Sequence, residues 1–589
     1  MTPEQHAREK TDSLENVSAE RPHTDKRNRT RREFIKAAGA AFTGAAALPR
    51  MLAGQALSGA SLGNHTPTPV PKIRGMMVDA ARLPETLDYY RRVVEFCSEW
   101  ELNTLQFRLT DDQGTAMRFS SVPNLVTHQH AFTPEQLKQL VDYGKTHGVD
   151  LLPEVEAFGH TGYITRSPAY AHLLDRDPNG SSTFTGIIPV HPETLELMGK
   201  LFREVATIFP SKYLHGGCDE VNWGGSEQSR KALEVKPRAQ IWADYLNALN
   251  HLSAGLDKEF IVWGDFVLHK EPEILARLDK NIVIMDWNYW DTSAIQFHDA
   301  LGKVRANGSR GIGAPGLISY RWGPRPGTEQ LRNIDAFADA YGGAEDAGSL
   351  GVILTNWVPT RYLQNSLWDG FAYGAIAFKD GSVAAQTSGL RWFVERHFGA
   401  QWNDGWSEAF DLLYDAAPMH GERGGASPLC MQLQVPYSDE PSLTEVLKKR
   451  TPLPNPFMQI RSLFTLVEPT VEKNLPDFQS MLLSVEYLGA MYWRQNLILE
   501  HAAAKTIDEP TARQMIEIIA ERDRQLARKL NDDWNDGRFV DSRAKTMPIY
   551  GLQPKDQLLA QWNRAAAFTE SLAAHPDRFY QLLKSARLA

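Results

Sequence analysis

Tyr213-Leu-His-Gly-Gly-Cys-Asp-Glu-Val221 joins a short apolar segment to two adjacent carboxylates. If residues 213–217 form a strand, Asp219 and Glu220 lie at or just past its carboxyl end. In a parallel α/β barrel, that end of the strands carries the catalytic groups. Adjacent acidic residues are also common in exposed turns. The glycines beside the pair and Trp223 just after it favour a catalytic site over a surface turn.

Apolar strand-like segments alternate with helical patterns from residue 73 to about residue 380. In seven of eight such repeats, polar or aromatic residues cluster just after the strand. This pattern predicts an α/β fold of the TIM (β/α)8 barrel type. A doubly wound open sheet is the alternative, but no Gly-x-Gly-x-x-Gly follows the first strand. The predicted strands are residues 73–78, 103–109, 150–155, 213–217, 259–262, 282–285, 311–319 and 350–355.

The second half of the chain has a different character. We assign residues 73–400 to the barrel and residues 401–589 to a mainly helical C-terminal domain. Helical periodicity dominates in residues 479–503, 511–531 and 557–574, which are separated by turns containing Pro and Gly. This domain could add a wall to the active site or serve only as scaffold, and scaffold is the simpler expectation.

The N-terminus looks like a targeting segment. Thr30-Arg-Arg-Glu-Phe-Ile-Lys36 precedes an Ala- and Gly-rich run at residues 37–48, which is too short to span a bilayer. This arrangement resembles a bacterial twin-arginine export signal over residues 1–60, followed by a Pro-rich linker at residues 61–72. The alternative is a disordered basic terminus with a chance arginine pair. We expect an exported protein, periplasmic or extracellular, with no stable membrane span.

Composition excludes several classes of function. The net charge of −9 over 589 residues gives no basic footprint for nucleic acid. The three cysteines, Cys97, Cys218 and Cys430, are too scattered for a disulfide framework or a zinc site. Fifteen tryptophans are a high number. Aromatic residues often line sugar sites, although most of these are expected in the core.

Several acidic groups at strand ends suggest glycoside hydrolysis, which needs a carboxylic acid to protonate the leaving oxygen. Neighbouring side chains on a strand point to opposite faces. Asp219 and Glu220 therefore do not suit the roles of acid and nucleophile across one glycosidic bond. A better division has one of them reach the scissile oxygen and the other reach a group on the sugar. An adjacent 2-acetamido group can itself be the nucleophile, because substrate assistance is a known exception to the two-carboxylate scheme.

The Asp-Glu segment resembles the signature of glycoside hydrolase family 20, the β-N-acetylhexosaminidases. Within the family, three segments most resemble the hexosaminidase D type: Phe158-Gly-His160, Gly217-Cys-Asp-Glu-Val221 and Ile353-Leu-Thr-x-Trp357. Further motifs occur in the same order as in that family, over residues 73 to 380. We expect no counterpart of the α/β domain that usually precedes the barrel in the family, because the linker begins only a few residues after the proposed signal. The matching segments are Arg74-Gly-Met-Met-Val-Asp-Ala-Ala-Arg82, Leu109-Thr-Asp-Asp-Gln-Gly114, Pro153-Glu-Val-Glu-Ala-Phe-Gly-His160 and Val262-Trp-Gly-Asp265.

The resemblance implies unequal roles for the acidic pair. Glu220 would be the general acid and base, with a pKa raised by burial and by the charge of Asp219. Asp219 would accept a hydrogen bond from the acetamido N–H and stabilise the oxazolinium-like intermediate. His160 would form a supporting dyad with Asp111 or Asp112. We assign Asp111 to the catalytic group and Asp112 to the substrate-binding group, and a purely structural histidine is the alternative.

The resemblance also implies a substrate-binding wall for an N-acetylhexosamine-containing glycan, with no cofactor and no metal. An arginine fork suits vicinal hydroxyls, and three tryptophans would enclose the acetamido methyl and the sugar face. A tyrosine would hold the acetamido carbonyl, for which Tyr289 is nearly as good a candidate as Tyr320. The expected substrate-binding residues are Arg82, Asp112, Trp263, Trp287, Tyr320 and Trp357.

Two positions depart from the family pattern. Position 108 is Arg where the family often has His. Pro359 stands two positions after Trp357, where many members carry a Glu that contacts distal sugar hydroxyls. The second departure leaves the choice between GlcNAc and GalNAc open.

Three other functions remain as alternatives. A two-carboxylate retaining β-glycosidase would pair Glu154 or Glu156 with Glu220. A non-catalytic sugar-binding barrel would use only the aromatic cleft. A metal-dependent hydrolase would use His215, Asp219 and His160, but no His-Glu-x-x-His spacing supports it.

Overall fold

Eight parallel strands close into a barrel, as the sequence predicted. Each strand pairs with the next along the chain, and the last strand pairs back onto the first, with Arg74 opposite Val352. The strands are β1 (Ile73–Val78), β2 (Thr104–Arg108), β6 (Asp150–Glu154), β9 (Tyr213–His215), β10 (Glu259–Trp263), β11 (Val283–Asp286), β12 (Arg310–Gly313) and β14 (Ser349–Asn356).

This computed structural model describes residues 73–176, 185–318, 324–343, 348–416, 436–448, 452, 454–503, 508–539 and 557–588. The proposed export signal, the linker, Cys430 and Tyr320 lie outside these ranges. Within them, no helix has the length and apolar character needed to cross a bilayer.

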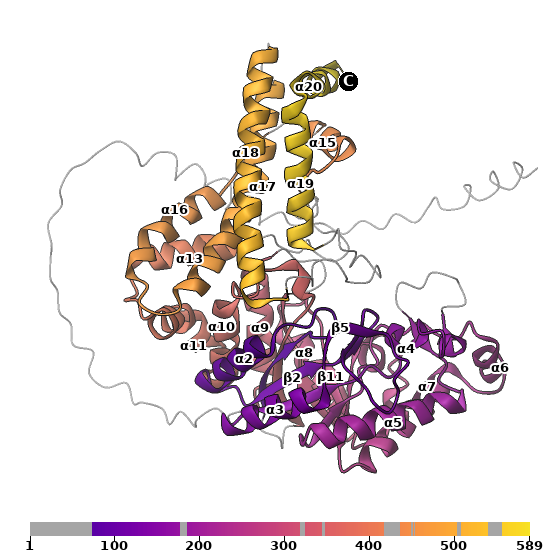
Figure 1. Cartoon of the computed structure of the whole chain (residues 1–589). Helices are drawn as coiled ribbons and strands as arrows, with labels where there is room; N and C mark the ends of the chain where they lie inside the picture. The colour runs from indigo at the N-terminus through magenta and orange to yellow at the C-terminus, as the bar shows by residue number, and fades with distance from the viewer. Residues whose placement is uncertain are drawn as a thin grey trace, which may run out of the picture. The chain divides into compact units, whose positions relative to one another are not determined.

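Helices cover the outside of the barrel (Figure 1). Their starts follow local capping rules. Thr133 and Gln136 form a reciprocal capping box at the start of α3, with Pro134 in the first turn. The covering helices are α2 (Leu87–Glu99), α3 (Pro134–Thr146), α5 (Pro192–Ile208), α7 (Arg238–Ala254), α8 (Ala294–Ala306), α9 (Thr328–Tyr341) and α10 (Trp368–Asp380).

Two connections differ from a regular repeat. No α-helix joins β10 to β11, and this segment instead forms a π-type turn (Asp265–Lys270) and a 3-10 turn (Leu275–Arg277). The predicted strand at residues 311–319 is split into β12 and β13 (Gly316–Ile318). Pro315 lies between them, and a proline has no N–H to donate to a strand ladder.

Smaller elements decorate the barrel's connections. A three-stranded sheet follows β2, a two-stranded ribbon and two short helices follow β6, and one further helix, α6, follows β9. These elements are β3 (Thr110–Asp111), β4 (Gly114–Met117), β5 (Thr127–Phe132), α4 (Gly162–Thr165), η2 (Ala171–Leu173), β7 (Leu174–Asp175), β8 (Gly186–Ile187) and α6 (Glu227–Val235).

The C-terminal half is helical, as predicted. A 3-10 turn at residues 359–361 and consecutive α- and π-helical segments at residues 382–398 come first. The helices after them include a long pair, α17 and α18, beside α19 (Figure 1). A separate apolar cluster between the outer helices includes Leu443, Ile516 and Leu583. The helices are α13 (Asp404–Ala416), α15 (Glu440–Leu447), α16 (Phe457–Val467), α17 (Leu475–Ala503), α18 (Glu509–Gly537), α19 (Leu558–Ala574) and α20 (Pro576–Leu588).

Candidate active site

The acidic pair lies just beyond β9, in an irregular turn at the carboxyl end of the barrel. Three successive departures from extended backbone place it there, because φ is +63° at Gly217, +73° at Cys218 and +47° at Glu220. A side chain at position 217 is excluded, since its Cβ would lie 1.9 Å from a carboxylate oxygen of Glu156. The turn brings Asp219 and Glu220 together on one side, where a regular strand would have separated them.

Both carboxylates converge on the imidazole of His160. Its Nε2 lies 3.3 Å from Oε2 of Glu220 and 3.8 Å from Oδ2 of Asp219. His160 follows Gly159, whose Cβ position lies 1.9 Å from the carbonyl oxygen of Asp219. Only a glycine allows this close approach of the two loops.

The other imidazole nitrogen identifies the partner of His160. Nδ1 bonds to Oδ2 of Asp112 at 3.1 Å and lies 3.5 Å from Asp111. Asp112 is buried and also accepts from the N–H of Gly162 at 2.8 Å and from the Thr185 hydroxyl. The oxygens of Asp112 are thus bonded within the protein, and its assignment to the substrate stays a prediction.

Asp111 belongs to a second group, which holds Arg82. The Arg82 fork contacts Oδ2 of Asp111 at 3.1 Å and Oδ2 of Asp79 at 2.9 Å. Its guanidinium lies 5.3 Å from the centre of the Trp357 ring. Asp111 thus orients the predicted sugar-binding arginine. It lies farther from His160 than Asp112 does, at 3.5 Å against 3.1 Å.

Arg108 organises the base of the site and was noted in the sequence only as a departure. Its guanidinium is fully buried and bonds to Glu154 at 2.5 Å, Glu156 at 2.6 Å and Asp111 at 2.6 Å. Three carboxylates from two strand ends share this one cation. Glu154 also accepts from the indole N–H of Trp263 at 3.1 Å.

Three predicted tryptophans form one aromatic wall. The rings of Trp263 and Trp357 have centroids 5.6 Å apart, and the Trp357 indole N–H donates to the Tyr289 hydroxyl at 2.7 Å. The Trp287 ring lies 5.2 Å from that of Tyr289. Tyr289, the alternative candidate for the acetamido carbonyl, is therefore part of this wall.

Asp265, at the end of β10, was missed as a site residue although its motif was recognised. Its Oδ2 accepts from the backbone N–H of Glu220 at 3.2 Å and contacts Lys270 Nζ at 2.7 Å. The acid therefore holds the backbone of Glu220 in its unusual conformation. Its position directly after a predicted strand was the available signal.

The pKa values of the two acids are shifted in opposite directions. Burial raises the pKa of Asp219 to about 6, although His160 and Arg108 oppose this shift. Burial also raises the pKa of Glu220. The hydrogen bond from His160 and the charges of His160 and Lys270 outweigh burial, and the pKa of Glu220 lies below its usual range. Burial disfavours a charged imidazole, yet Asp219, Asp112 and Glu220 raise the pKa of His160 well above its usual value.

The expected rise in the pKa of Glu220 is therefore wrong for the free site. The physical reason is that the neighbouring imidazole carries the proton and stabilises the carboxylate. The Glu220 side chain also keeps 34% of its surface exposed, so it is incompletely desolvated.

Comparison with known proteins agrees with this geometry. Residues 72–320 match the family profile described as glycosyl hydrolase family 20, catalytic domain. The barrel therefore resembles the catalytic domain of that family. A β-hexosaminidase of Vibrio furnissii is 26% identical over 247 residues, which cover 37% of this chain and 40% of that protein. A β-hexosaminidase of Akkermansia muciniphila is 28% identical over 209 residues, which cover 32% of this chain and 42% of that protein.

Among solved structures, the family 20 exo-β-N-acetylglucosaminidase of Vibrio harveyi, in complex with N-acetylglucosamine, aligns with 20% identity. The alignment covers 54% of each chain with a TM-score of 0.42. This chain spans about two fifths of the length of the two curated relatives.

Glu154 and Glu156 are poor candidates for a second catalytic carboxylate. Both are completely buried and bonded to Arg108. The second oxygen of Glu156 accepts from the N–H of Cys218 at 3.1 Å. Burial raises the pKa of Glu156 well above its usual value, although Arg108 opposes the shift.

Two acidic groups around His160 contain residue types that can bind a cation, one with Asp111 and Asp112 and one with Asp219 and Glu220. Each imidazole nitrogen faces a carboxylate, at 3.1 Å for Asp112 and 3.3 Å for Glu220. This is the geometry of a hydrogen-bonded relay. His215, the third ligand of the metal alternative, instead accepts from the N–H of Gly217 at 2.9 Å.

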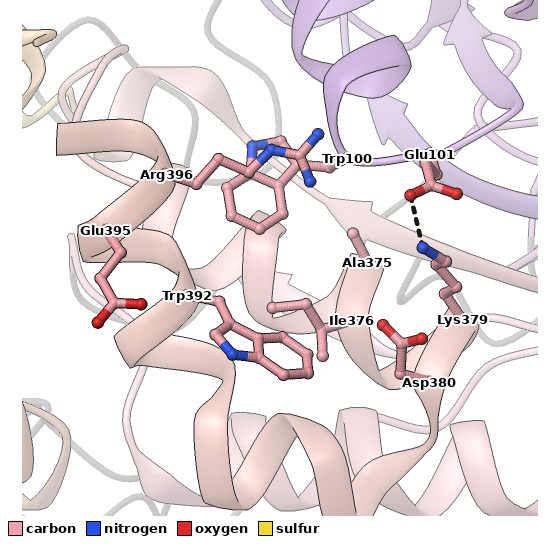
Figure 2. Close-up of a pocket in the computed structure, with 9 residues that line it drawn as sticks. All are labelled: Trp100, Glu101, Ala375, Ile376, Lys379, Asp380, Trp392, Glu395 and Arg396. Atoms are coloured by element: carbon pink, nitrogen blue, oxygen red, sulfur yellow. Dashed lines mark hydrogen bonds and ion pairs between the residues drawn. The ribbon is translucent and has the colours of Figure 1, made fainter. Parts of the chain in front are cut away.

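A hollow of about 510 Å³ lies at the other end of the barrel (Figure 2). It is lined by Trp100 and Glu101, which precede β2, and by residues of α10 and the segment after it, including Trp392. Figure 2 shows that its Glu101 and Lys379 pair with each other. None of the clustered strand-end groups reaches this hollow, so the candidate active site is at the carboxyl end.

Proposed function

We propose that this protein is a retaining exo-β-N-acetylhexosaminidase that removes terminal β-linked GlcNAc or GalNAc with the help of the substrate's acetamido group. One observation carries the proposal. Oδ1 of Asp219 is buried, and none of the described residues donates a hydrogen bond to it. A buried acceptor without a donor is costly. An acetamido N–H would supply that donor, beside an acid that can reach the glycosidic oxygen.

Glu220 is the proposed general acid. In the free site the proton of the His160–Glu220 pair rests on the imidazole, because the pKa of His160 is raised and that of Glu220 is lowered. A sugar that covers Glu220 removes its remaining exposure, and desolvation disfavours the carboxylate. The proton then passes from Nε2 of His160 to Oε2 of Glu220, across 3.3 Å, and on to the leaving oxygen.

Asp219 is the proposed partner of the acetamido group. As a carboxylate it accepts from the N–H, turns the carbonyl oxygen towards the anomeric carbon and offsets the positive charge of the oxazolinium ion. Glu220 then removes a proton from water, which attacks the same carbon. Two displacements at one centre return the original anomeric configuration. Arg82 and the aromatic wall of Trp263, Trp287 and Trp357 would bind the sugar.

A comparison of three chromogenic substrates tests this reaction. Nitrophenyl β-GlcNAc, β-GalNAc and β-glucoside differ in the acetamido group and in one hydroxyl configuration. The wild type is expected to hydrolyse one or both acetamido sugars and to leave the glucoside nearly untouched. The ratio of the first two decides the preference that the departure at Pro359 leaves open.

Two variants locate the chemistry. Glu220→Gln should lower kcat/KM by about 10²–10⁴-fold, the usual contribution of a general acid. Glu234→Gln, on the exposed surface of α6, is the matched control and should keep wild-type rates. Equal turnover of the glucoside would refute substrate assistance and favour a two-carboxylate glycosidase. Sugar binding without any turnover would favour a non-catalytic barrel.

We also propose that the protein is exported by the twin-arginine route and is of the hexosaminidase D type. The Arg-Arg pair before an apolar run supports export. Replacing Arg31 and Arg32 by Lys in a bacterial host should retain activity in the cytoplasmic fraction. Unchanged export of that variant would contradict the assignment of the signal. The likeness of Gly217-Cys-Asp-Glu-Val221 supports the subtype.

A further inference from the structure

The end of helix α18 inserts a buried arginine between two loops of the barrel. Nε of Arg538 bonds to both oxygens of Glu85, at 3.0 and 3.1 Å. Its two other nitrogens donate to backbone carbonyls, that of Tyr362 at 3.1 Å and that of Pro359 at 2.8 Å. One side chain from the C-terminal half thus joins the loop after β1 to the loop after β14.

These two loops carry the proposed sugar-binding residues. Arg82 precedes Glu85 in the first loop, and Trp357 precedes Pro359 in the second. The loops also meet directly, because the N–H of Val358 donates to Oδ2 of Asp79 at 3.1 Å. The same oxygen binds the Arg82 fork at 2.9 Å.

The backbone between Trp357 and Pro359 is in an unusual conformation. Val358 has φ of +58°, which is strained for a β-branched residue. Such a conformation persists only where the surroundings hold it. The bond from Arg538 to the Pro359 carbonyl and the bond from Val358 to Asp79 hold the two sides of this residue.

The helix end is built to place Arg538 at this point. The carbonyl of Gly537 accepts from the Thr86 hydroxyl and from the Gln364 amide, both at 3.2 Å. A Cβ at position 537 would lie 1.9 Å from the Gln364 side-chain oxygen, so a larger residue would displace the Gln364 amide. The Phe539 ring then stacks on His130, with centroids 4.0 Å apart.

A role in stability alone explains this arrangement poorly. A buried ion pair gives weak net stabilisation, and apolar residues of similar size often do as well. Burial raises the pKa of Glu85 to about 7 against the effect of Arg538, so the pair is costly to desolvate. The planar fork of an arginine can bind several acceptors in a set geometry, which an apolar contact cannot do.

We propose that Arg538 is a positioning residue for sugar recognition, which sets the separation of Arg82 and Trp357 by tying their loops together. The proposal rests on the proposed function, because it concerns the same sugar site. It assigns the C-terminal helical half a part in that site, where the sequence favoured a scaffold.

Two substitutions of Arg538 test the proposal, with Arg528→Gln as the control. Arg528 lies on the same helix with 65% of its side chain exposed. Arg538→Lys keeps the charge beside Glu85 but cannot bind both carbonyls and the carboxylate in the same way. Arg538→Gln removes the charge.

Arg82 would bind sugar hydroxyls away from the scissile bond, so its displacement weakens substrate and transition state alike. Both Arg538 variants should therefore raise KM for nitrophenyl β-GlcNAc by about 10-fold, with kcat changed less than about 3-fold. In an Arg82→Lys background the same substitutions should change KM less than about 2-fold, since residues that act as a unit are not additive. The control should match the wild type.

An unchanged KM in folded Arg538→Lys would overturn the proposal, even with a lower melting temperature. An equal effect on KM in the wild-type and Arg82→Lys backgrounds would also overturn it. If Arg538→Gln does not fold, the Lys variant decides.

A different result would refute the proposed function and leave the positioning role open to test: a wild type that hydrolyses no acetamido sugar. In that case the Kd of N-acetylglucosamine, measured by the change in tryptophan fluorescence, is compared in place of KM. A roughly 10-fold weaker Kd in Arg538→Lys supports the positioning role, and an equal Kd refutes it.

Discussion

Asp219→Asn should make the folded protein more stable at neutral and alkaline pH while it abolishes the proposed activity. The carboxyl is almost completely buried, and one of its oxygens receives no hydrogen bond from the described residues. Its ionised form is therefore poorly stabilised in the free protein. The substitution removes that charge with little change of shape.

The size of the effect follows from the pKa. Burial raises the pKa of Asp219 from 3.8 to about 6. A difference of about 2 units corresponds to ~3 kcal/mol. Because the folded state binds the proton more tightly than the unfolded state, the penalty is fully present above pH 6 and disappears as the pH falls towards 3.8. Asp219→Asn should thus gain ~3 kcal/mol in the free energy of unfolding at pH 8 and less than ~1 kcal/mol at pH 4.

Thermal and urea unfolding of the two proteins at pH 8, 6 and 4 measures this difference. Asp175→Asn is the matched control, because Asp175 is also buried but accepts five hydrogen bonds, from Arg176, Gly225, Ser226 and Ser229. Loss of a bonded acceptor should destabilise that variant by about 1–3 kcal/mol at pH 8. If Asp219→Asn proves less stable than wild type at pH 8, or gains equally at pH 8 and pH 4, the reasoning is refuted.

Three further predictions concern the same cluster. The pH profile of kcat/KM should fall about tenfold per unit below pH 6, because Asp219 must be ionised to accept the acetamido N–H and has a pKa of about 6; an acid limb well below pH 5 would contradict this. Arg108→Met leaves Glu154 and Glu156 buried without their cation, so urea unfolding at pH 8 should show a loss of ~3–5 kcal/mol, which shrinks at pH 5 as the carboxyls protonate. Gly159→Ala places a Cβ 1.9 Å from the Asp219 carbonyl oxygen and should lower kcat/KM by about 10²-fold at an unchanged pH optimum; wild-type kinetics would show that the loop yields freely.

Most of the barrel could be predicted because each buried strand is an apolar run that ends in polar or aromatic residues. The sequence pattern could not show the missing helix between β10 and β11, where the chain turns at once to bring Asp265 under Glu220. The split of the seventh strand could have been predicted from the sequence. Pro315 lies in it and cannot donate to the ladder.

The site, like the fold, could be predicted only in part from the sequence. The strand-end rule located Glu220, Asp219, His160 and Arg82, whose side chains the structure brings within one connected cluster. It could not rank Asp111 against Asp112, because which of two neighbours in a turn faces the imidazole depends on backbone angles. Nor could it find Arg538, which lies 453 positions from Glu85 and meets it only through the packing of the two halves.

Two adjacent acids can face one partner only if the backbone between them adopts an unusual conformation, which the sequence pattern does not show. Neighbours on a strand point apart, so both can face His160 only if the chain leaves the extended conformation between them. Left-handed angles at Cys218 and Glu220 do this, and non-glycine residues held there cost about 1–3 kcal/mol each. The N–H of Cys218 is bound by Glu156 and that of Glu220 by Asp265. Glu156 and Asp265 therefore hold the backbone that makes the two adjacent carboxylates converge, as the proposed reaction requires.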